Sequence, residues 1–293
     1  MKTHVPVLVQ EVMELLSPKE GDSILDVTVG LGGHSSKFLE VIGSSGQLIG
    51  LDADEENLKL AGEQLDAPNV ELIHSNFRKL ASLNIPPQDI IFADLGLSSP
   101  HIDDASRGFS FREDGPLDLR FDRTKGWTAT LLLARSSEEQ IESILRKYGE
   151  IERPHKLAHA LSHENPKTTG GVRLCIEEVF GYRAPRVMPQ IFQALRIAVN
   201  DELGALETLL SEGPQLLKPG GRMGVISFHS LEDRMVKQAF RTLSTGIKDE
   251  ITGAIKEEAP FAIRTKKPVM PSEEEIAKNQ RCRSAKLRVL TRL

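Results

Sequence analysis

The sequence predicts an α/β protein in which helices cover a parallel sheet and a helical domain is inserted into the sheet domain. Short aliphatic runs alternate with helical stretches between Ser23 and Asp94, and this alternation is typical of βαβ units. The interval between Asp94 and Arg222 exceeds by roughly 100 residues the ~30 that a βαβ unit requires. That excess is enough chain for a separate domain.

Runs rich in aliphatic and β-branched residues are expected to be strands of this sheet. They are Ser23–Gly30, Gln47–Asp52, Val70–His74, Asp89–Asp94 and Arg222–Phe228. Helices are expected at His34–Ile42, Asp54–Leu65 and Leu231–Leu243. Asp54 is expected to be an N-cap, because its side chain can accept hydrogen bonds from first-turn amides. The chain closes on Lys286–Thr291, whose apolar residues alternate as in a strand.

The long interval reads as helical, since Ser137–Lys147 and Pro189–Leu210 carry apolar residues at three- and four-residue spacing. We therefore expect residues 1–101 to form the first part of the sheet domain and residues 212–293 the second. Residues 102–211 are expected to form an inserted helical domain that recognises the substrate. Glu250–Glu275 shows no clear pattern and is expected to be a long loop.

Composition excludes several classes of protein. A chain of 293 residues with 39% hydrophobic and 27% charged residues is neither disordered nor fibrous. Its longest apolar runs, such as Leu131–Ala134, are far too short to span a bilayer, and no secretory segment follows Met1, so a cytoplasmic protein without a membrane partner is expected. Cys175 and Cys282 are the only cysteines, too few for a cysteine-rich zinc site. The net charge of −5 disfavours indiscriminate nucleic-acid binding.

A glycine-rich turn, Asp26-Val-Thr-Val-Gly-Leu-Gly-Gly-His34, joins the first expected strand to the first helix, and Asp52 ends the second strand. Glycines let the backbone approach a ligand, and an acid on the second strand can bind ribose hydroxyls, so NAD and S-adenosylmethionine are both candidates. A carboxylate at Asp26 would repel a pyrophosphate but attract the cationic methionine end of S-adenosylmethionine. The alternative is a turn that only closes a βα connection.

Several segments, with this turn, form a wider pattern: Asp94-Leu-Gly-Leu-Ser-Ser-Pro100, Arg107-Gly-Phe-Ser-Phe-Arg112, Arg196-Ile-Ala-Val-Asn-Asp-Glu-Leu203, Ser227-Phe-His-Ser-Leu-Glu-Asp-Arg234 and Arg283-Ser-Ala-Lys-Leu-Arg288. The pattern resembles the ribosomal RNA small subunit methyltransferase H family, from His4 to the C-terminus. The resemblance implies a class I S-adenosylmethionine-dependent methyltransferase with a Rossmann-like sheet and an inserted helical domain. It also implies methylation of N4 of a cytidine in the decoding region (P site) of bacterial 16S rRNA, within the small ribosomal subunit or a late assembly intermediate. A homodimer stays open.

The resemblance implies that seven residues bind S-adenosylmethionine: Gly32, Gly33, His34, Asp52, Phe77, Asp94 and His101. Phe77 ends the third strand, where its ring can pack on a purine or close the core. His101 stands where the family commonly has Gln, and an imidazole can donate one hydrogen bond as an amide does. His34 opens a helix, where a contribution from its backbone N–H alone is the alternative.

Asp94, Ser98 and Ser99 are expected to be catalytic. Their segment follows the fourth strand, at the sheet edge where ligands of open α/β folds bind. Its Ser-Ser-Pro resembles the Ser-Pro-Pro-aromatic motif of DNA cytosine-N4 methyltransferases. Hydrogen-bond acceptors there would orient a cytosine amine and support its developing positive charge. Phe109 or Phe111 would stack on the extruded base, with core packing as the alternative.

Other clusters are less specific. His155, His159 and His163 recur every four residues, but no cysteine or carboxylate cluster accompanies them, so no metal site is expected. Residues 153–200 contain seven Lys or Arg and three Glu. Residues 281–293 contain five Lys or Arg and no acidic residue. Such patches suit RNA phosphates or a solvated surface equally. Two rival classes are a non-catalytic S-adenosylmethionine- or RNA-binding module and an NAD-dependent oxidoreductase, which Asp26 disfavours.

Overall fold

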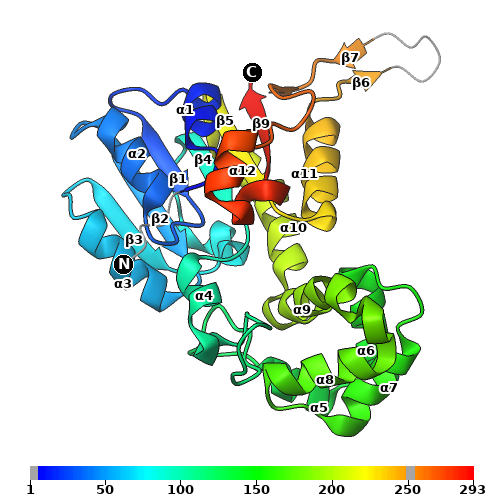
Figure 1. Cartoon of the computed structure of the whole chain (residues 1–293). Helices are drawn as coiled ribbons and strands as arrows, with labels where there is room; N and C mark the ends of the chain where they lie inside the picture. The colour runs from blue at the N-terminus through cyan, green and yellow to red at the C-terminus, as the bar shows by residue number, and fades with distance from the viewer. Residues whose placement is uncertain (1–5, 249–254) are drawn as a thin grey trace. The chain divides into compact units, whose positions relative to one another are not determined.

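The computed structural model describes residues 6–248 and 255–293. The chain divides into two compact units, one formed by Met1–Gly96 with Gly204–Leu293 and the other by Leu97–Leu203 (Figure 1). The second unit begins and ends earlier than the insert expected at 102–211. Its end differs because helix α10 (Glu202–Glu212) contributes Leu206, Leu209 and Leu210 to the core of the first unit. The expected family match begins at His4, which lies outside the described residues.

The described part of the first unit contains a seven-stranded sheet in the order β3-β2-β1-β4-β5-β9-β8. Its strands are β1 (Ser23–Asp26), β2 (Gln47–Asp52), β3 (Val70–His74), β4 (Gln88–Asp94), β5 (Leu217–Ser227), β8 (Phe261–Ile263) and β9 (Lys286–Arg292). Strands β1 to β5 pair in parallel, whereas β9 is antiparallel to both β5 and β8. The carboxyl ends of β1, β2 and β4 therefore share one sheet edge.

Alternation along the strands buries both faces of this sheet. In β4, Ile90 and Phe92 face one apolar core, while Ile91 and Ala93 face the other. The first core is completed by α1 (Val9–Leu16), α2 (Gly33–Ile42) and α3 (Glu55–Gln64). The second is completed by α10, α11 (Ser230–Leu243) and the 3-10 turn η1 (Phe77–Leu83). Helices on both faces explain why the strands read as nearly continuous apolar runs.

The second unit is helical, as its apolar spacing predicts. Its helices are α4 (Ser99–Asp103), α5 (Ala129–Arg135), α6 (Glu138–Gly149), α7 (His155–Glu164), α8 (Thr169–Phe180) and α9 (Ala184–Asn200). They enclose one core that includes Leu145, Leu161 and Ile191. The stretch expected to be helical from Pro189 to Leu210 is interrupted at Asp201, whose φ of 48° ends α9 before α10 begins. Periodicity did not reveal this break, because apolar residues continue at helical spacing on both sides.

Local predictions near the sheet are largely confirmed. Asp54 caps α3, and its carboxylate accepts a 2.9 Å hydrogen bond from the backbone N–H of Glu56. The first strand is shorter than expected and ends at Asp26, and β5 starts earlier than expected, at Leu217.

The prediction of a long loop at Glu250–Glu275 is wrong for part of this segment. Residues 250–254 lie outside the described residues, and the remainder contains β7 (Ile255–Glu257), β8 and the start of α12 (Glu273–Lys278). Strand β7 pairs with the short strand β6 (Ile247–Lys248), and three-residue strands such as β8 are too short for a periodic signal. None of the helices in the described ranges has the length and apolar character needed to cross a membrane.

Candidate active site

The glycine turn after β1 has a backbone that requires glycine. Gly30 and Gly32 have φ angles of 55° and 86°, in the left-handed region that side chains disfavour. A Cβ on Gly32 would also lie 3.2 Å from the side chain of Leu65. The turn is closed by a 2.8 Å hydrogen bond from the Gly32 N–H to the Val29 carbonyl. The next residue, Gly33, begins helix α2.

The Asp26 side chain is buried below the turn's surface and is only 1% exposed. Its carboxylate accepts hydrogen bonds from the Ser35 hydroxyl at 2.6 Å and from the Thr28 N–H at 3.0 Å. Burial raises the pKa of Asp26 to about 6, against the lowering effect of these hydrogen bonds, and the Asp52 charge raises it slightly further. Besides carrying a charge that would repel a pyrophosphate, Asp26 joins β1 to α2 through these hydrogen bonds.

Asp52 lies at the carboxyl end of β2 with both oxygens held by backbone amides. Its Oδ2 accepts a 2.7 Å hydrogen bond from the Gly30 N–H, and its Oδ1 accepts a 2.8 Å hydrogen bond from the Asp54 N–H. These contacts fix the carboxylate against the glycine turn. A carboxylate has roughly four acceptor positions, so it can accept hydroxyl groups in addition to amides.

Asp94, at the carboxyl end of β4, has a buried oxygen without a partner. Its backbone N–H donates to the Thr28 hydroxyl at 2.6 Å, which joins β4 to the turn. Its side chain is 21% exposed, but Oδ1 is shielded from solvent and has no hydrogen-bond partner among the described residues. Burial raises the pKa of Asp94 well above its ordinary value, and the nearby charges of Asp26 and Glu232 raise it further.

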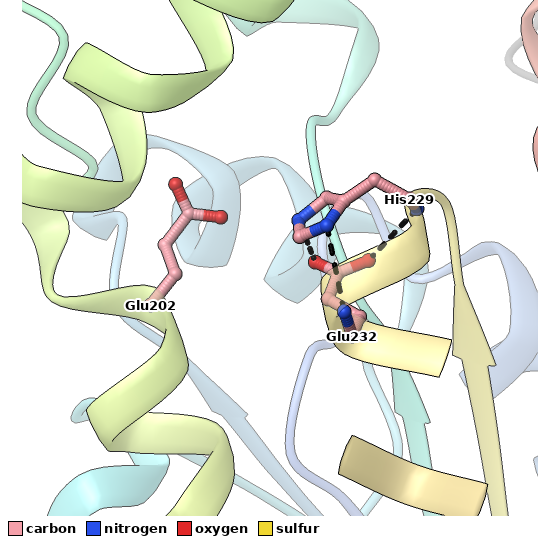
Figure 2. Close-up of side chains that lie close together, drawn as sticks. All are labelled: Glu202, His229 and Glu232. Atoms are coloured by element: carbon pink, nitrogen blue, oxygen red, sulfur yellow. Dashed lines mark hydrogen bonds and ion pairs between the residues drawn. The ribbon is translucent and has the colours of Figure 1, made fainter. Parts of the chain in front are cut away.

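Glu232, in the first turn of α11, is 2% exposed and pairs with His229. The Nε2 atom of His229 lies 3.0 Å from a Glu232 carboxylate oxygen (Figure 2). The other carboxylate oxygen accepts the Phe228 N–H at 2.8 Å. These contacts fix the start of α11 at the end of β5. The charges of Glu232 and Asp26 both act on Asp94, so these three carboxyl side chains lie in the same part of the first unit.

The His34 ring contributes contacts of its own. It is 6% exposed, and its Nε2 donates a 2.8 Å hydrogen bond to the Val7 carbonyl. Its Nδ1 lies 3.6 Å from Asp94 Oδ2. The structure therefore brings together Gly32, Gly33, His34, Asp52 and Asp94 in the first unit. Phe77 is half-buried at the start of η1, where it packs against the second core of the sheet.

Ser98, Ser99 and His101 belong to the second unit and form a local structure there. Ser98 precedes the short helix α4, and its N–H donates a 3.1 Å hydrogen bond to Nδ1 of His101. An Nδ1 that accepts an N–H carries no proton, so this ring has its hydrogen on Nε2. The His101 ring is 3% exposed and packs 4.9 Å from the Phe109 ring. The spatial relation of these residues to Asp94 stays a prediction.

The aromatic pair considered for base stacking serves the core of the second unit. Phe109 is 7% exposed and stacks on Phe121 at 5.6 Å, so the packing alternative applies to it. Phe111 is half-buried and contacts the Phe192 ring at 5.4 Å. Arg107 is buried beside them, and its guanidinium donates to the Phe121 carbonyl at 3.1 Å. The family-like segment from Arg107 to Arg112 is thus partly structural.

Two other sequence features have structural partners. Arg288 and Lys286 pair with Asp233 at 2.7 and 3.4 Å, which occupies two cations of the C-terminal basic segment. His159 and His163 are exposed, and each lies within 3.1 Å of a glutamate oxygen. The two C-terminal cations and the two histidines therefore interact with acidic side chains of the protein itself.

Sequence reasoning missed Thr28, Ser35 and Glu232 as parts of the site. Thr28 and Ser35 hold Asp26 and Asp94, and Glu232 lies in one of the family-like segments. The usable signal was the spacing Asp26-x-Thr28, since a threonine two residues after an aspartate can bond its side chain locally.

The strand order, the antiparallel β9 and the acid-lined glycine turn define the class I methyltransferase fold. Residues 1–293 match the MraW methylase family, and the chain belongs to that family.

Similar proteins share most of the chain's length. The "Ribosomal RNA small subunit methyltransferase H" of Solidesulfovibrio magneticus is 43% identical over 99% of this chain and 95% of its own. The protein of the same name from Symbiobacterium thermophilum is 41% identical over 99% of this chain and 96% of its own. A solved structure titled as a putative rRNA-methylase from Clostridium thermocellum is 13% identical, with a TM-score of 0.48, and covers 99% of this chain and 100% of that one.

Proposed function

We propose that this protein transfers a methyl group from S-adenosylmethionine to N4 of a cytidine in the decoding region (P site) of 16S rRNA. The substrate would be the small ribosomal subunit or a late assembly intermediate, in the cytoplasm. Support for the RNA comes from relatives of about 40% identity whose names specify small-subunit ribosomal RNA. Support for the chemistry comes from one observation, the buried and unpartnered Asp94 Oδ1 at the sheet edge.

The residues of the first unit fit S-adenosylmethionine. A buried oxygen without a donor, Asp94 Oδ1, suits a ligand amine. The Asp52 carboxylate suits ribose hydroxyls, because it lies at the end of β2 beside the turn. Gly32 and Gly33 leave the turn without side chains where a ligand approaches, and the His34 ring lies beside Asp94. Phe77 is proposed to contact the adenine and His101 to complete the cofactor site.

When bound, S-adenosylmethionine supplies an electrophilic methyl group. Asp94, Ser98 and Ser99 are the proposed acceptors for the target amine. The N4 lone pair of cytosine is delocalised into the ring, so acceptors that orient the amine and stabilise its positive charge lower the barrier. A strong general base is unnecessary, because the methylated, ammonium-like nitrogen is acidic enough to lose its proton to water.

The experiment compares transfer and binding for wild-type protein and three variants, using methyl-labelled S-adenosylmethionine and small subunits that lack the modification. Wild-type protein is expected to label the RNA and to bind S-adenosylmethionine but not NAD. Asp94→Ala is expected to abolish turnover, whereas Ser98→Ala and Ser99→Ala should slow it with little change in cofactor affinity. Cofactor binding without any labelling would favour a non-catalytic binding module, and full single-turnover rates in Asp94→Ala would refute the proposed role of Asp94.

A further inference from the structure

Helix α11 carries a cationic face that is not part of the residues proposed for methyl transfer. Arg234, Lys237 and Arg241 are exposed, and no acidic residue occurs between Arg234 and Thr245. Positions i, i+3 and i+7 share one side of a helix. The opposite side packs into the first unit through the buried side chains of Leu231, Val236 and Phe240.

A surface groove of about 650 Å³ lies against this face. The described residues that line it are all basic or polar: Arg234, Lys237, Gln238, Arg241, Thr242 and Thr245. Protein–protein interfaces are usually centred on aromatic or aliphatic anchors, and the described residues of the lining include none. Arg, Lys, Gln and Thr are instead the side chains that contact phosphates and sugars in nucleic-acid complexes. The lining therefore fits an RNA backbone better than a protein surface.

The charges of Lys237 and Arg241 on this face are not balanced by acidic neighbours between Arg234 and the end of the helix. Lys237 and Arg241 are one helical turn apart, and like charges at this spacing destabilise a helix by a few tenths of a kcal/mol. Lys286 and Arg288 differ, since both pair with Asp233. Within the described residues no carboxylate pairs with Lys237 or Arg241. On a chain of net charge −5, such a surface attracts polyanions to one particular place.

The cationic face also begins close to the candidate active site within the first unit. Helix α11 starts directly after β5, and Glu232 in its first turn acts electrostatically on Asp94. Arg234 follows two residues later, and at 1.5 Å per residue the cations from Arg234 to Arg241 extend about 10 Å along the helix axis. An RNA strand bound along these cations would pass near the sheet edge that carries Asp94.

We propose that the Arg234–Lys237–Arg241 face of α11 binds the phosphate backbone of the substrate RNA. This inference rests on the proposed function, because it takes RNA as the substrate. The face contributes affinity and register, while the nucleotide is selected elsewhere, as is usual for phosphate contacts.

The test uses the full chain and the double variant Lys237→Gln/Arg241→Gln. The matched control is Lys37→Gln/Lys59→Gln, which removes two exposed lysines from α2 and α3 that already have acidic partners. Binding to unmodified small subunits and to protein-free 16S rRNA is measured from 50 to 200 mM salt. Each lost phosphate contact lowers the salt slope by about 0.7 for a single strand, so the α11 variant should lose about 1.4. We expect roughly tenfold weaker binding at 50 mM salt, a higher KM for subunits, and unchanged kcat and S-adenosylmethionine affinity.

Three results would overturn the inference alone while wild-type protein still methylates subunits. One is an α11 variant with the wild-type salt slope, and another is an equal loss in the control variant. The third is weaker binding to subunits with unchanged binding to protein-free 16S rRNA, which would assign the face to a ribosomal protein. If wild-type protein neither binds nor methylates small subunits, the proposed function fails and this inference fails with it.

Discussion

Nδ1 of His34 lies 3.6 Å from Oδ2 of Asp94. The same imidazole donates to the Val7 carbonyl, so one ring joins the segment before α1, the start of α2 and the end of β4. The backbone of Asp94 is also held, because its N–H donates to the Thr28 hydroxyl, whereas Oδ1 of its side chain has no partner among the described residues. A carboxyl with an unpaired oxygen is prepared for a ligand, and its protonation should respond to that ligand.

Binding of S-adenosylmethionine is expected to release protons from Asp94. Burial and the charges of Asp26 and Glu232 raise the pKa of Asp94, and a cationic ligand favours the ionised carboxylate. The affinity should therefore rise with pH until Asp94 is ionised in the free protein. Calorimetry in buffers of different ionisation enthalpy measures the released protons. Asp94→Asn should release fewer, and equal proton release by both proteins would count against this role.

Asp52→Ala is expected to weaken S-adenosylmethionine binding by roughly ten- to a hundredfold. The estimate follows from losing a charge-assisted hydrogen bond of about 1.5–3 kcal/mol. The variant also loses the acceptors for the Gly30 and Asp54 amides, so Asp52→Asn, which keeps one acceptor oxygen, is the companion variant and should fall between. Calorimetry gives the affinities and circular dichroism checks the fold. Wild-type affinity in a folded Asp52→Ala protein would remove Asp52 from the site.

Asp26→Asn is expected to change how stability depends on pH. The pKa of Asp26 is about 6 in the folded protein against an ordinary value of 3.8, so between these values the folded state binds more protons than the unfolded state. The Asp26 contribution to the free energy of unfolding is therefore fully present below about pH 4 and falls as pH rises through 6. The total change is about 3 kcal/mol.

Urea unfolding of both proteins from pH 4 to 8 measures this effect. Asn keeps an acceptor oxygen for Thr28 but does not titrate, so Asp26→Asn should gain stability relative to wild type across the window. A difference between the two proteins that is constant with pH would show that Asp26 titrates normally.

The extent of helix α10 predicts which internal deletion folds. Replacing residues 97–203 by a short linker keeps Leu206, Leu209 and Leu210 in the sheet core, together with Gly32, Asp52 and Asp94. That protein should fold and bind S-adenosylmethionine measurably but not methylate RNA. Replacing 102–211 removes all three leucines, each worth about 2–5 kcal/mol if truncated to alanine, and should not fold. Thermal unfolding compares the two, and a stable 102–211 deletion would contradict the assignment of α10 to the first unit's core.

Most strands of the sheet, and the position of the glycine turn between β1 and α2, were predictable from sequence. Strands β2 and β3 have the expected bounds, because short aliphatic runs between turns carry a strong signal. Asp52 and Asp94 were identifiable because acids that end parallel strands collect at one edge. The break at Asp201 and the short strand β8 were not predictable, since one left-handed residue and a three-residue edge strand leave the apolar pattern unchanged.

The sequence predicts a set of candidate site residues but not the contacts among them. Asp26 was interpreted only through its charge toward a ligand, yet Ser35 and Thr28 bind it inside the first unit. Phe109 was interpreted as a stacking candidate or core residue, and only its packing on Phe121 decides for the core. Such partners lie far apart in sequence or depend on side-chain orientation, which spacing does not encode.

Nucleoside mass spectrometry can identify the product of methyl transfer to the exocyclic amine of one cytidine. Unmodified small subunits are incubated with the protein and methyl-labelled S-adenosylmethionine, the 16S rRNA is digested, and the labelled nucleoside is identified and located. We expect N4-methylcytidine at a single position in the decoding region, and none with Asp94→Ala. Label on carbon 5 of cytosine, on a ribose 2′-oxygen or on another base would contradict it.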